Sequence, residues 1–112
     1  MDNNSAGLKE VWCWKIVEIE SNFIKTLFHG NFRSRILPRG QWLKAEIRLN
    51  VQDGNGTPYK SGWHVFLDRG TAESYLKRFK KERWIISCKA KGLRKKEHSR
   101  GDVYLANWLF IS

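Results

Sequence analysis

Val103-Tyr-Leu-Ala-Asn-Trp-Leu-Phe-Ile111, close to the C-terminus, is the stretch of sequence that decides the fold. It is apolar at almost every position, and Asn107 is the one strongly polar side chain that interrupts it. A strand without a polar face is covered on both faces, which is typical of the middle of a sheet. The segment therefore predicts a central strand around which the other elements are arranged.

Alternation of apolar and polar residues predicts further strands. It is strict over 42–51, and similar patterns cover 10–19, 62–67 and 83–91. Segment 22–29 fits a short helix as well as a strand, and a strand is favoured. The residues predicted to face the core are Leu43, Ala45, Ile47, Leu49 and Val51 in one strand and Trp84, Ile86, Cys88 and Ala90 in another. The turn-forming residues of 53–58 predict that 42–51 and 62–67 form a hairpin with a long tip.

One helix is predicted over residues 71–82. Its apolar stripe has helical spacing, Thr71 suits the N-cap position, and basic residues gather near the negative end of the helix dipole. The stripe consists of Ala72, Tyr75, Leu76 and Phe79. The predicted fold class is therefore α+β, a mostly antiparallel twisted sheet or half-barrel of about five or six strands packed on one helix (71–82).

The 112 residues fit a single domain, and a hydrophobic fraction of 41% exceeds that of disordered chains. We expect residues 1–7 to form a disordered tail and 8–112 to form one α+β domain. No apolar run approaches the ~20 residues that span a bilayer, and no segment has the pattern of a signal peptide. The expected location is cytoplasmic.

Cys13 and Cys88 each lie within an apolar, strand-like run. Neither has a second Cys or a His at the spacing of metal ligands. We expect both to be reduced thiols in the core, and we predict neither a metal nor a cofactor.

Charge is the strongest functional signal, because 21 Lys and Arg against 11 Asp and Glu give a formal net charge of +10. Segment 77–100 alone holds eleven basic residues and two Glu, a net charge of +9. Such a surface would neutralise phosphates and release counterions, although a solvated helix face beside a solvated hairpin is the alternative. The predicted nucleic-acid-binding residues are Lys77, Arg78, Lys80, Lys81, Lys89, Lys91, Arg94, Lys95, Lys96 and Arg100, extended by Arg33, Arg35 and Arg39 of a basic loop.

Aromatic residues are interleaved with this charge, and exposed rings would provide a stacking platform for unpaired bases. Most of the rings occupy positions that predict burial. Tyr59, Trp42 and Trp63 flank turns and are the candidates for exposure.

Catalysis has little support in the sequence. His29, His64 and His98 could serve acid–base chemistry in a metal-free ribonuclease, but their spacing does not favour it, and no catalytic residue is predicted. The chain contains no glycine-rich phosphate loop, nucleophile elbow or paired carboxylates.

The segment Gly62-Trp-His-Val-Phe66, followed by Ala72 at the start of a helix and by two strands, resembles small uncharacterised bacterial and phage proteins that carry a Gly-aromatic-His-x-Phe segment. The resemblance covers about half the chain. It implies a phage or prophage setting and assigns a role to no residue.

The leading hypothesis is a small, non-enzymatic basic domain that contacts nucleic-acid phosphates in RNA or DNA. The alternative is a phage-type inhibitor or regulator that binds a host protein or nucleoprotein complex, and a small ribonuclease is third. The expected partners are thus a nucleic acid or other polyanion, or an acidic or nucleic-acid-binding protein, and not a membrane.

Overall fold

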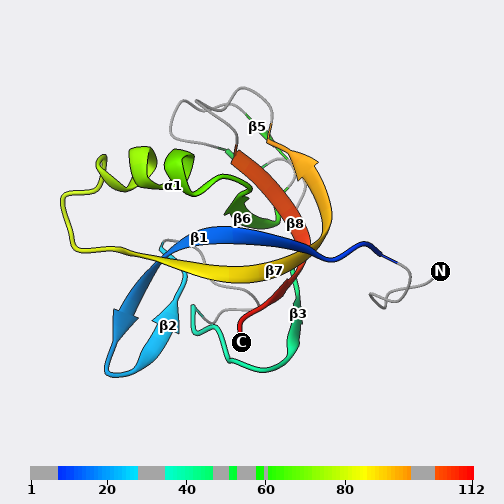
Figure 1. The fold of residues 1–112 in the computed structure, drawn as a ribbon, viewed down its shortest axis with the longest axis horizontal. Coiled ribbons are helices and arrows are strands. Elements are labelled where there is room, and N and C mark those ends of the chain that lie inside the picture. Colours follow the sequence, from blue (N-terminus) through cyan, green and yellow to red (C-terminus); the bar gives the residue numbers. More distant parts are fainter. Residues whose placement is uncertain (1–7, 28–34, 47–50, 53–57, 60, 97–102) are drawn as a thin grey trace.

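The computed structural model describes residues 8–27, 35–46, 51–52, 58–59, 61–96 and 103–112 (Figure 1). The elements in these ranges are β1 (Val11–Glu20), β2 (Phe23–Lys25), β3 (Trp42–Lys44), β4 (Val51–Gln52), β5 (Pro58–Tyr59), β6 (Trp63–Phe66), α1 (Arg69–Leu76), β7 (Trp84–Lys95) and β8 (Val103–Phe110). Within the described ranges, no helix has the length and apolar character needed to cross a membrane.

Strand β8 is the centre of the sheet, as its apolar sequence predicted. One of its edges pairs with β7 from Lys95↔Tyr104 to Lys89↔Phe110. The other edge pairs first with β6 and then with β3, and Asn107 marks the change between them. There the carbonyl of Asn107 accepts a hydrogen bond of 2.8 Å from the backbone N–H of Ala45. Both edges of β8 are therefore occupied.

The strand pairings close a ring. Strand β7 pairs with both β8 and β1, β8 pairs with β6, and β6 meets β1 at Trp14↔Phe66. Strands β2 and β3 extend the sheet from β1 and β8, and all of these pairs are antiparallel. Over the described residues, the predicted α+β fold is thus confirmed, with a six-stranded antiparallel sheet and one helix.

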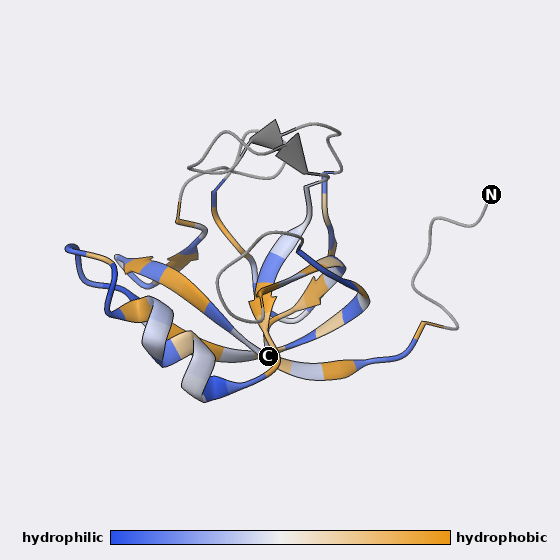
Figure 2. Ribbon diagram, turned by 90° about the horizontal axis from the view of Figure 1, so that it is seen from above, coloured by the Kyte–Doolittle hydropathy of each residue, from blue (hydrophilic) through white to orange (hydrophobic). Residues whose placement is uncertain are grey.

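The interior of the ring is the main hydrophobic core. Strand residues alternate between this inner face and the outer face, and Figure 2 shows the corresponding change between hydrophobic and hydrophilic positions along the strands. The inner cluster includes Cys13, Val17, Trp63, Val65, Cys88, Ala90, Ala106, Leu109 and Ile111, with Leu43, Leu93 and Tyr104 packed against it. Because these side chains are buried inside the ring, the residues that alternate with them along each strand lie on the outer face.

The helix packs on the outer face of the sheet. Ala72 is fully buried against Ile16, Phe66 and Val103, and Tyr75, Leu76 and Phe79 pack around this second cluster. The predicted apolar stripe is thus confirmed. Its strand partners lie on the face opposite to the inner core.

The predicted bounds of the helix, 71–82, are wrong at both ends. Asp68 is the N-cap, and its Oδ2 accepts hydrogen bonds from the N–H of Thr71 at 2.9 Å and from its Oγ1 at 3.1 Å. An ionised carboxylate is a strong acceptor for free N–H groups at a helix start, so Asp68 caps in place of Thr71. At the other end the N–H of Phe79 bonds to the carbonyl of Leu76 at 3.2 Å, a three-residue spacing that tightens and ends the helix.

The predicted hairpin between 42–51 and 62–67 is also wrong. Strands β3 and β6 both pair with β8, one after the other along the same edge. The hairpin in this region is the short β4–β5 pair, in register at Val51↔Tyr59 and Gln52↔Pro58. The apolar central strand offers more burial than a pair of half-polar strands, so both segments join it.

Residues 1–7, the predicted tail, lie outside the described ranges.

Candidate nucleic-acid interface

One row of side chains crosses four strands on the outer face. Trp12 of β1 lies opposite Lys89 of β7, Lys89 lies opposite Phe110 of β8, and Phe110 lies opposite Trp42 of β3. Residues that are directly opposite each other in a sheet project from the same face. We call these four residues the aromatic row.

The aromatic row holds two kinds of contact, between a ring and a cation and between two rings. The Lys89 ammonium nitrogen lies 5.1 Å from the ring centroid of Trp12 and 5.8 Å from that of Phe110. The rings of Phe110 and Trp42 are tilted against each other at 5.4 Å. A positive charge is therefore held between aromatic rings on neighbouring strands.

Trp12 is the most open ring of the row. It is 62% exposed, although it is a large apolar residue, and it lies at the end of the row near the start of β1. Trp42, Lys89 and Phe110 are half-buried. A ring with this exposure retains enough open area for a flat apolar ligand to stack on it.

A second row lies beside the first. Lys91 of β7 and Lys44 of β3 both lie opposite Trp108 of β8. Lys91 is largely buried, with its ammonium nitrogen 4.2 Å from the ring centroid of Trp42, whereas Lys44 is exposed. The two rows together thus place three lysines among four aromatic rings on this face.

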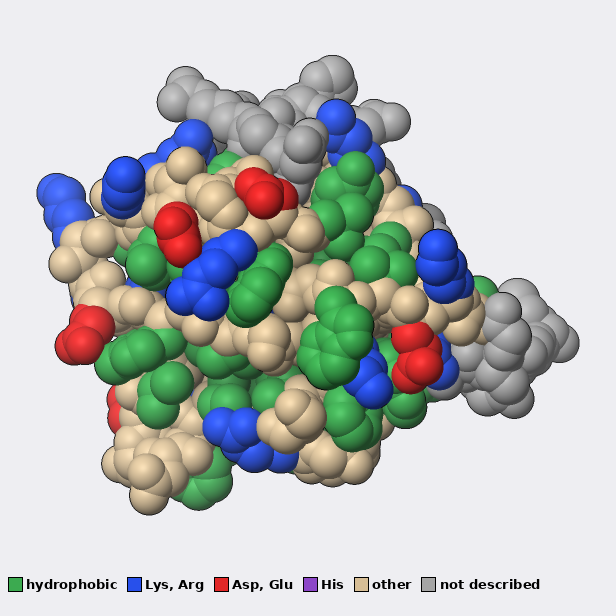
Figure 3. Space-filling model, in the orientation of Figure 1, with side chains coloured by type: hydrophobic (Ala, Val, Ile, Leu, Met, Phe, Trp, Pro, Cys, Tyr) green, Lys and Arg blue, Asp and Glu red, His purple; other side chains and the backbone are tan. Residues whose placement is uncertain are grey.

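The helix covers the other end of the same face. Moving along β1 away from Trp12, the next outer residues are Trp14 and Ile16, which pack in the cluster beneath α1. The guanidinium of Arg69 lies 5.0 Å from the ring centroid of Trp14. Figure 3 shows hydrophobic side chains next to Lys and Arg side chains over the face on which β1 and β7 lie in front. The aromatic row is therefore the part of this face that the helix leaves uncovered.

The predicted basic residues fall into separate groups. Lys89 and Lys91 belong to the two rows. Lys77, Arg78, Lys80 and Lys81 are exposed at and after the end of α1, where the Arg78 guanidinium lies 4.1 Å from the ring centroid of Tyr75. Lys95 is exposed and Lys96 half-buried at the end of β7. Arg33 and Arg100 lie outside the described residues.

Arg94 is engaged by the fold. Its Nη1 donates to Oδ1 of Asn107 at 2.8 Å, and its Nη2 donates to the carbonyl of Ser61. Gly62 provides the room, because a Cβ there would lie 3.2 Å from Nη2 of Arg94 and 3.0 Å from the carbonyl oxygen of Ala106. The guanidinium thus ties β7 to β8 and to the start of β6.

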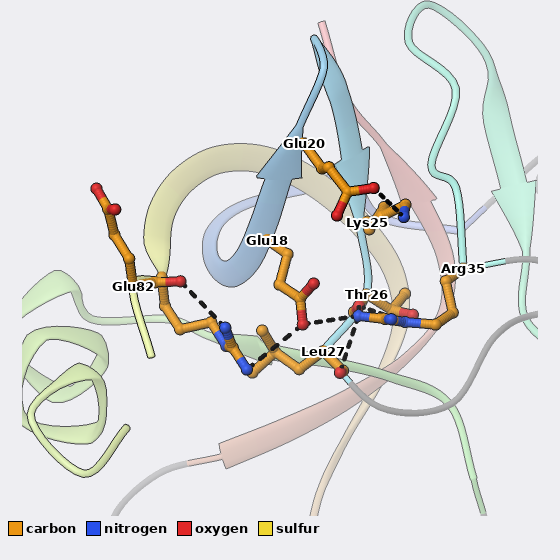
Figure 4. A network of polar contacts seen from close by, with 8 residues as sticks. Glu18, Glu20, Lys25, Thr26, Leu27, Arg35 and Glu82 are labelled. Atoms are coloured by element: carbon orange, nitrogen blue, oxygen red, sulfur yellow. Dashed lines mark hydrogen bonds and ion pairs between the residues drawn. The ribbon is translucent and has the colours of Figure 1, made fainter. Parts of the chain in front are cut away.

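Arg35 is likewise held by backbone and carboxylate groups. It donates to the carbonyls of Thr26 and Leu27 and forms an ion pair of 2.8 Å with Glu18, which also lies 3.4 Å from Arg83 (Figure 4). Arg39 donates to the carbonyl of Ser112 at 2.7 Å. These contacts connect the segment after β2 to β1 and to the C-terminus.

The aromatic candidates are only partly those of the sequence. Trp63 is 5% exposed and its Nε1 donates to the carbonyl of Leu43 at 2.9 Å, so this candidate for exposure is a core residue. Trp42 does lie in the aromatic row, and the side chain of Tyr59 is outside the described set. Trp12 was not among the candidates predicted from the sequence. The alternation along the strand places Trp12 on the same face as Trp14. The sequence does not indicate how far the helix extends over that face, and this decides which ring is exposed.

The histidines show no catalytic arrangement in the described part of the chain. His64 is half-buried, and its backbone carbonyl accepts a hydrogen bond of 2.8 Å from Nζ of Lys15, whereas His29 and His98 lie outside the described residues. Among the residues that can be described, no group of three or more His, Cys, Asp or Glu could hold a metal ion.

Fold and surface together define a small α+β domain whose closed antiparallel ring carries a lysine-rich aromatic face. Comparison of the chain with known protein families, with curated proteins and with solved structures finds no match.

Proposed function

We propose that the protein binds single-stranded nucleic acid on the aromatic row. The observation that carries this proposal is the register that places Trp12, Lys89, Phe110 and Trp42 side by side across four strands. Each unpaired base that stacks on an exposed ring contributes roughly 1–3 kcal/mol, whichever base it is. Bases inside a duplex are stacked on each other and cannot reach such rings.

The lysines of the two rows supply the second element of recognition. Lys89 lies between two rings, so its ammonium group is placed where the phosphate between two stacked bases would pass. Lys44 is exposed on the neighbouring row. Phosphate contacts of this kind release counterions and fix the position of the strand without reading its sequence.

The chain as a whole favours a polyanionic partner. Its net charge of +10 attracts nucleic acid without selecting a site, and the basic residues after α1 add to this field. Charge alone would not distinguish single strands from duplexes. The exposed rings provide that distinction.

The test compares a fluorescently labelled oligothymidine with the same strand annealed to its complement, with oligouridine as the RNA counterpart. We expect the single strands to bind more tightly than the duplex. Trp12→Ala should weaken binding to single strands roughly 5- to 150-fold and leave duplex binding nearly unchanged.

Trp84→Ala is the matched control. Trp84 begins β7 and was predicted to face the core, but it is 37% exposed and, like Trp12, is an exposed tryptophan, outside the aromatic row. It should leave the affinity for single strands close to that of the wild type. Equal losses for the two variants, or a preference for the duplex, would contradict the proposed site. A folded protein that binds none of these probes at low salt would favour the protein-binding alternative.

A further inference from the structure

Two thiols face each other inside the ring. Cys13 of β1 and Cys88 of β7 are direct cross-strand partners, each is 1% exposed, and their sulfur atoms are 3.4 Å apart. Both are free cysteines. The Cα atoms of opposite residues in an antiparallel pair are ≈ 4.5–5.5 Å apart, a separation within the range that disulfides span.

We propose that Cys13 and Cys88 are a redox-active dithiol site, which a small-molecule disulfide such as oxidised glutathione converts to a disulfide between β1 and β7 without a change of strand register. The reaction needs two exchanges. The Cys88 thiolate attacks one sulfur of the oxidant, whose S–S bond breaks and releases a thiolate that takes up a proton. The Cys13 thiolate then attacks the Cys88 sulfur and releases the second glutathione. Two protein thiols are oxidised and one disulfide is reduced to two thiols.

The surroundings distinguish the two thiols. The hydrogen bond from Cys13 lowers the pKa of Cys88, burial opposes this, and the charge of Lys15 adds to it. The same hydrogen bond and burial raise the pKa of Cys13. Cys88 is therefore the thiol that ionises first, and Cys13 is the resolving thiol.

Burial sets the rate of the reaction. With 1% of each residue exposed, a tripeptide disulfide cannot reach the sulfur atoms until β1 separates locally from its neighbours. Within the described residues, the other edge of β1 pairs with β6 at a single position, Trp14↔Phe66. Opening along β1 exposes both thiols, so the site responds to sustained oxidation and not to a brief pulse.

The disulfide would join the strand pair directly beside Trp12 and Lys89, the next pair in the register. The inference rests on the geometry of the thiols and is independent of the proposed binding of nucleic acid. A failure of either one leaves the other in place.

The experiment unfolds the full chain in denaturant and dilutes it into a buffer of reduced and oxidised glutathione. The refolded protein should have the circular dichroism of the reduced protein, an intact mass lower by two hydrogen atoms, no bound glutathione and a higher urea midpoint. Cys13→Ala, which keeps an apolar residue at the buried position, should lose the shift in both mass and midpoint.

Three outcomes would overturn the proposal. The refolded protein could keep both thiols free in a buffer that oxidises the unfolded chain, or it could carry a stable glutathione adduct on either cysteine. The third outcome is a disulfide form whose circular dichroism differs from that of the reduced protein.

Discussion

Nη1 of Arg94 donates to Oδ1 of Asn107 over 2.8 Å, so the one polar side chain of the central strand is paired with a residue whose charge suggested a phosphate ligand. The second nitrogen of the guanidinium is bonded to the carbonyl of Ser61. Arg94 thus donates to one side-chain acceptor on β8 and one backbone acceptor just before β6. Its role in the structure is to hold β6, β7 and β8 together.

Replacement of Arg94 by Ala should therefore lower stability more than it lowers binding. Both of these hydrogen bonds are lost, at about 0.5–1.5 kcal/mol each. Arg94→Lys should also be destabilising, because an ammonium group does not reproduce the fork of two N–H donors. Urea denaturation measures the first effect and the salt dependence of oligonucleotide binding the second. An unchanged urea midpoint together with a reduced salt dependence of oligonucleotide binding would indicate that Arg94 binds phosphate.

Gly92 allows Asn107 to sit where Arg94 reaches it. Gly92 has φ of +68°, and a Cβ there would lie 3.0 Å from both Cβ and Nδ2 of Asn107. Gly92→Ala should cost roughly 1–2 kcal/mol for the left-handed backbone and more for this crowding.

Gly40→Ala is the matched control, because Gly40 has φ of +79° but a Cβ there would meet no atom of the described residues within 4 Å. Gly40→Ala should lose stability only through the strained backbone. Its urea midpoint should therefore fall less than the midpoint of Gly92→Ala. Equal falls for the two variants would show that contact with Asn107 carries no cost.

How far the sequence predicted the structure depends on the range of the interaction involved. The apolar segment 103–111 identified the central strand, and the stripe of Ala72, Tyr75, Leu76 and Phe79 identified the packing face of the helix, because burial follows directly from local periodicity. The helix bounds failed because they depend on a single cap at Asp68. The prediction of the hairpin failed because β3 and β6 pair with β8, which is far away in the chain, and not with each other.

The candidate site was predictable in composition and not in arrangement. Lys89, Lys91 and Trp42 were identified from charge and from their proximity to turns, and they do lie together. Trp12 and Phe110 join them through the register of three strand pairs, which no local pattern encodes. Arg35 and Arg94 illustrate the converse, since their charges are used within the fold.

Lys15 gives stability a pH dependence with a definite sign. It is 5% exposed on the inner face, donates to the carbonyl of His64 at 2.8 Å, and its neighbouring titratable groups there are Cys13 and Cys88. Burial lowers the pKa of Lys15 from 10.5 to about 8, an effect that the electrostatic interaction with the two cysteines opposes. Between these values the unfolded chain binds more protons than the folded one, so stability rises with pH.

The contribution of Lys15 to the free energy of unfolding should thus be lowest below pH 8 and increase by about 3 kcal/mol as the pH rises to 10.5. The pH profile of stability for Lys15→Met is subtracted from that of the wild type, which removes the contributions of the other titratable groups. The same comparison in a background with both cysteines replaced by Ala removes the contribution of the thiols. Urea denaturation across this range gives the difference. A difference that does not change with pH would mean that the Lys15 ammonium is solvated in the folded protein.

Salt dependence separates the rings of the aromatic row from its lysines. On single strands the logarithm of the affinity falls with the logarithm of the salt concentration by about 0.7 for each phosphate that is neutralised. Replacement of Lys44 and Lys89 by Gln should therefore reduce this slope by about 1.4, if each contacts one phosphate. Trp12→Ala should lower the affinity at every salt concentration and leave the slope unchanged, because stacking on a ring releases no counterions.

Replacement of Lys80 and Lys81 by Gln is the matched charge control, since both are exposed beyond the end of α1 and the change in net charge is the same. This pair should reduce the slope by less than the Lys44 and Lys89 pair does, because the helix separates it from the aromatic row. Fluorescence anisotropy of a labelled oligothymidine over a series of salt concentrations gives all the slopes. Equal reductions of the slope for the two pairs would mean that the lysines act only through the net charge of the protein. A change of the slope in Trp12→Ala would contradict the proposed division of roles, in which the ring stacks on bases and the lysines contact phosphates.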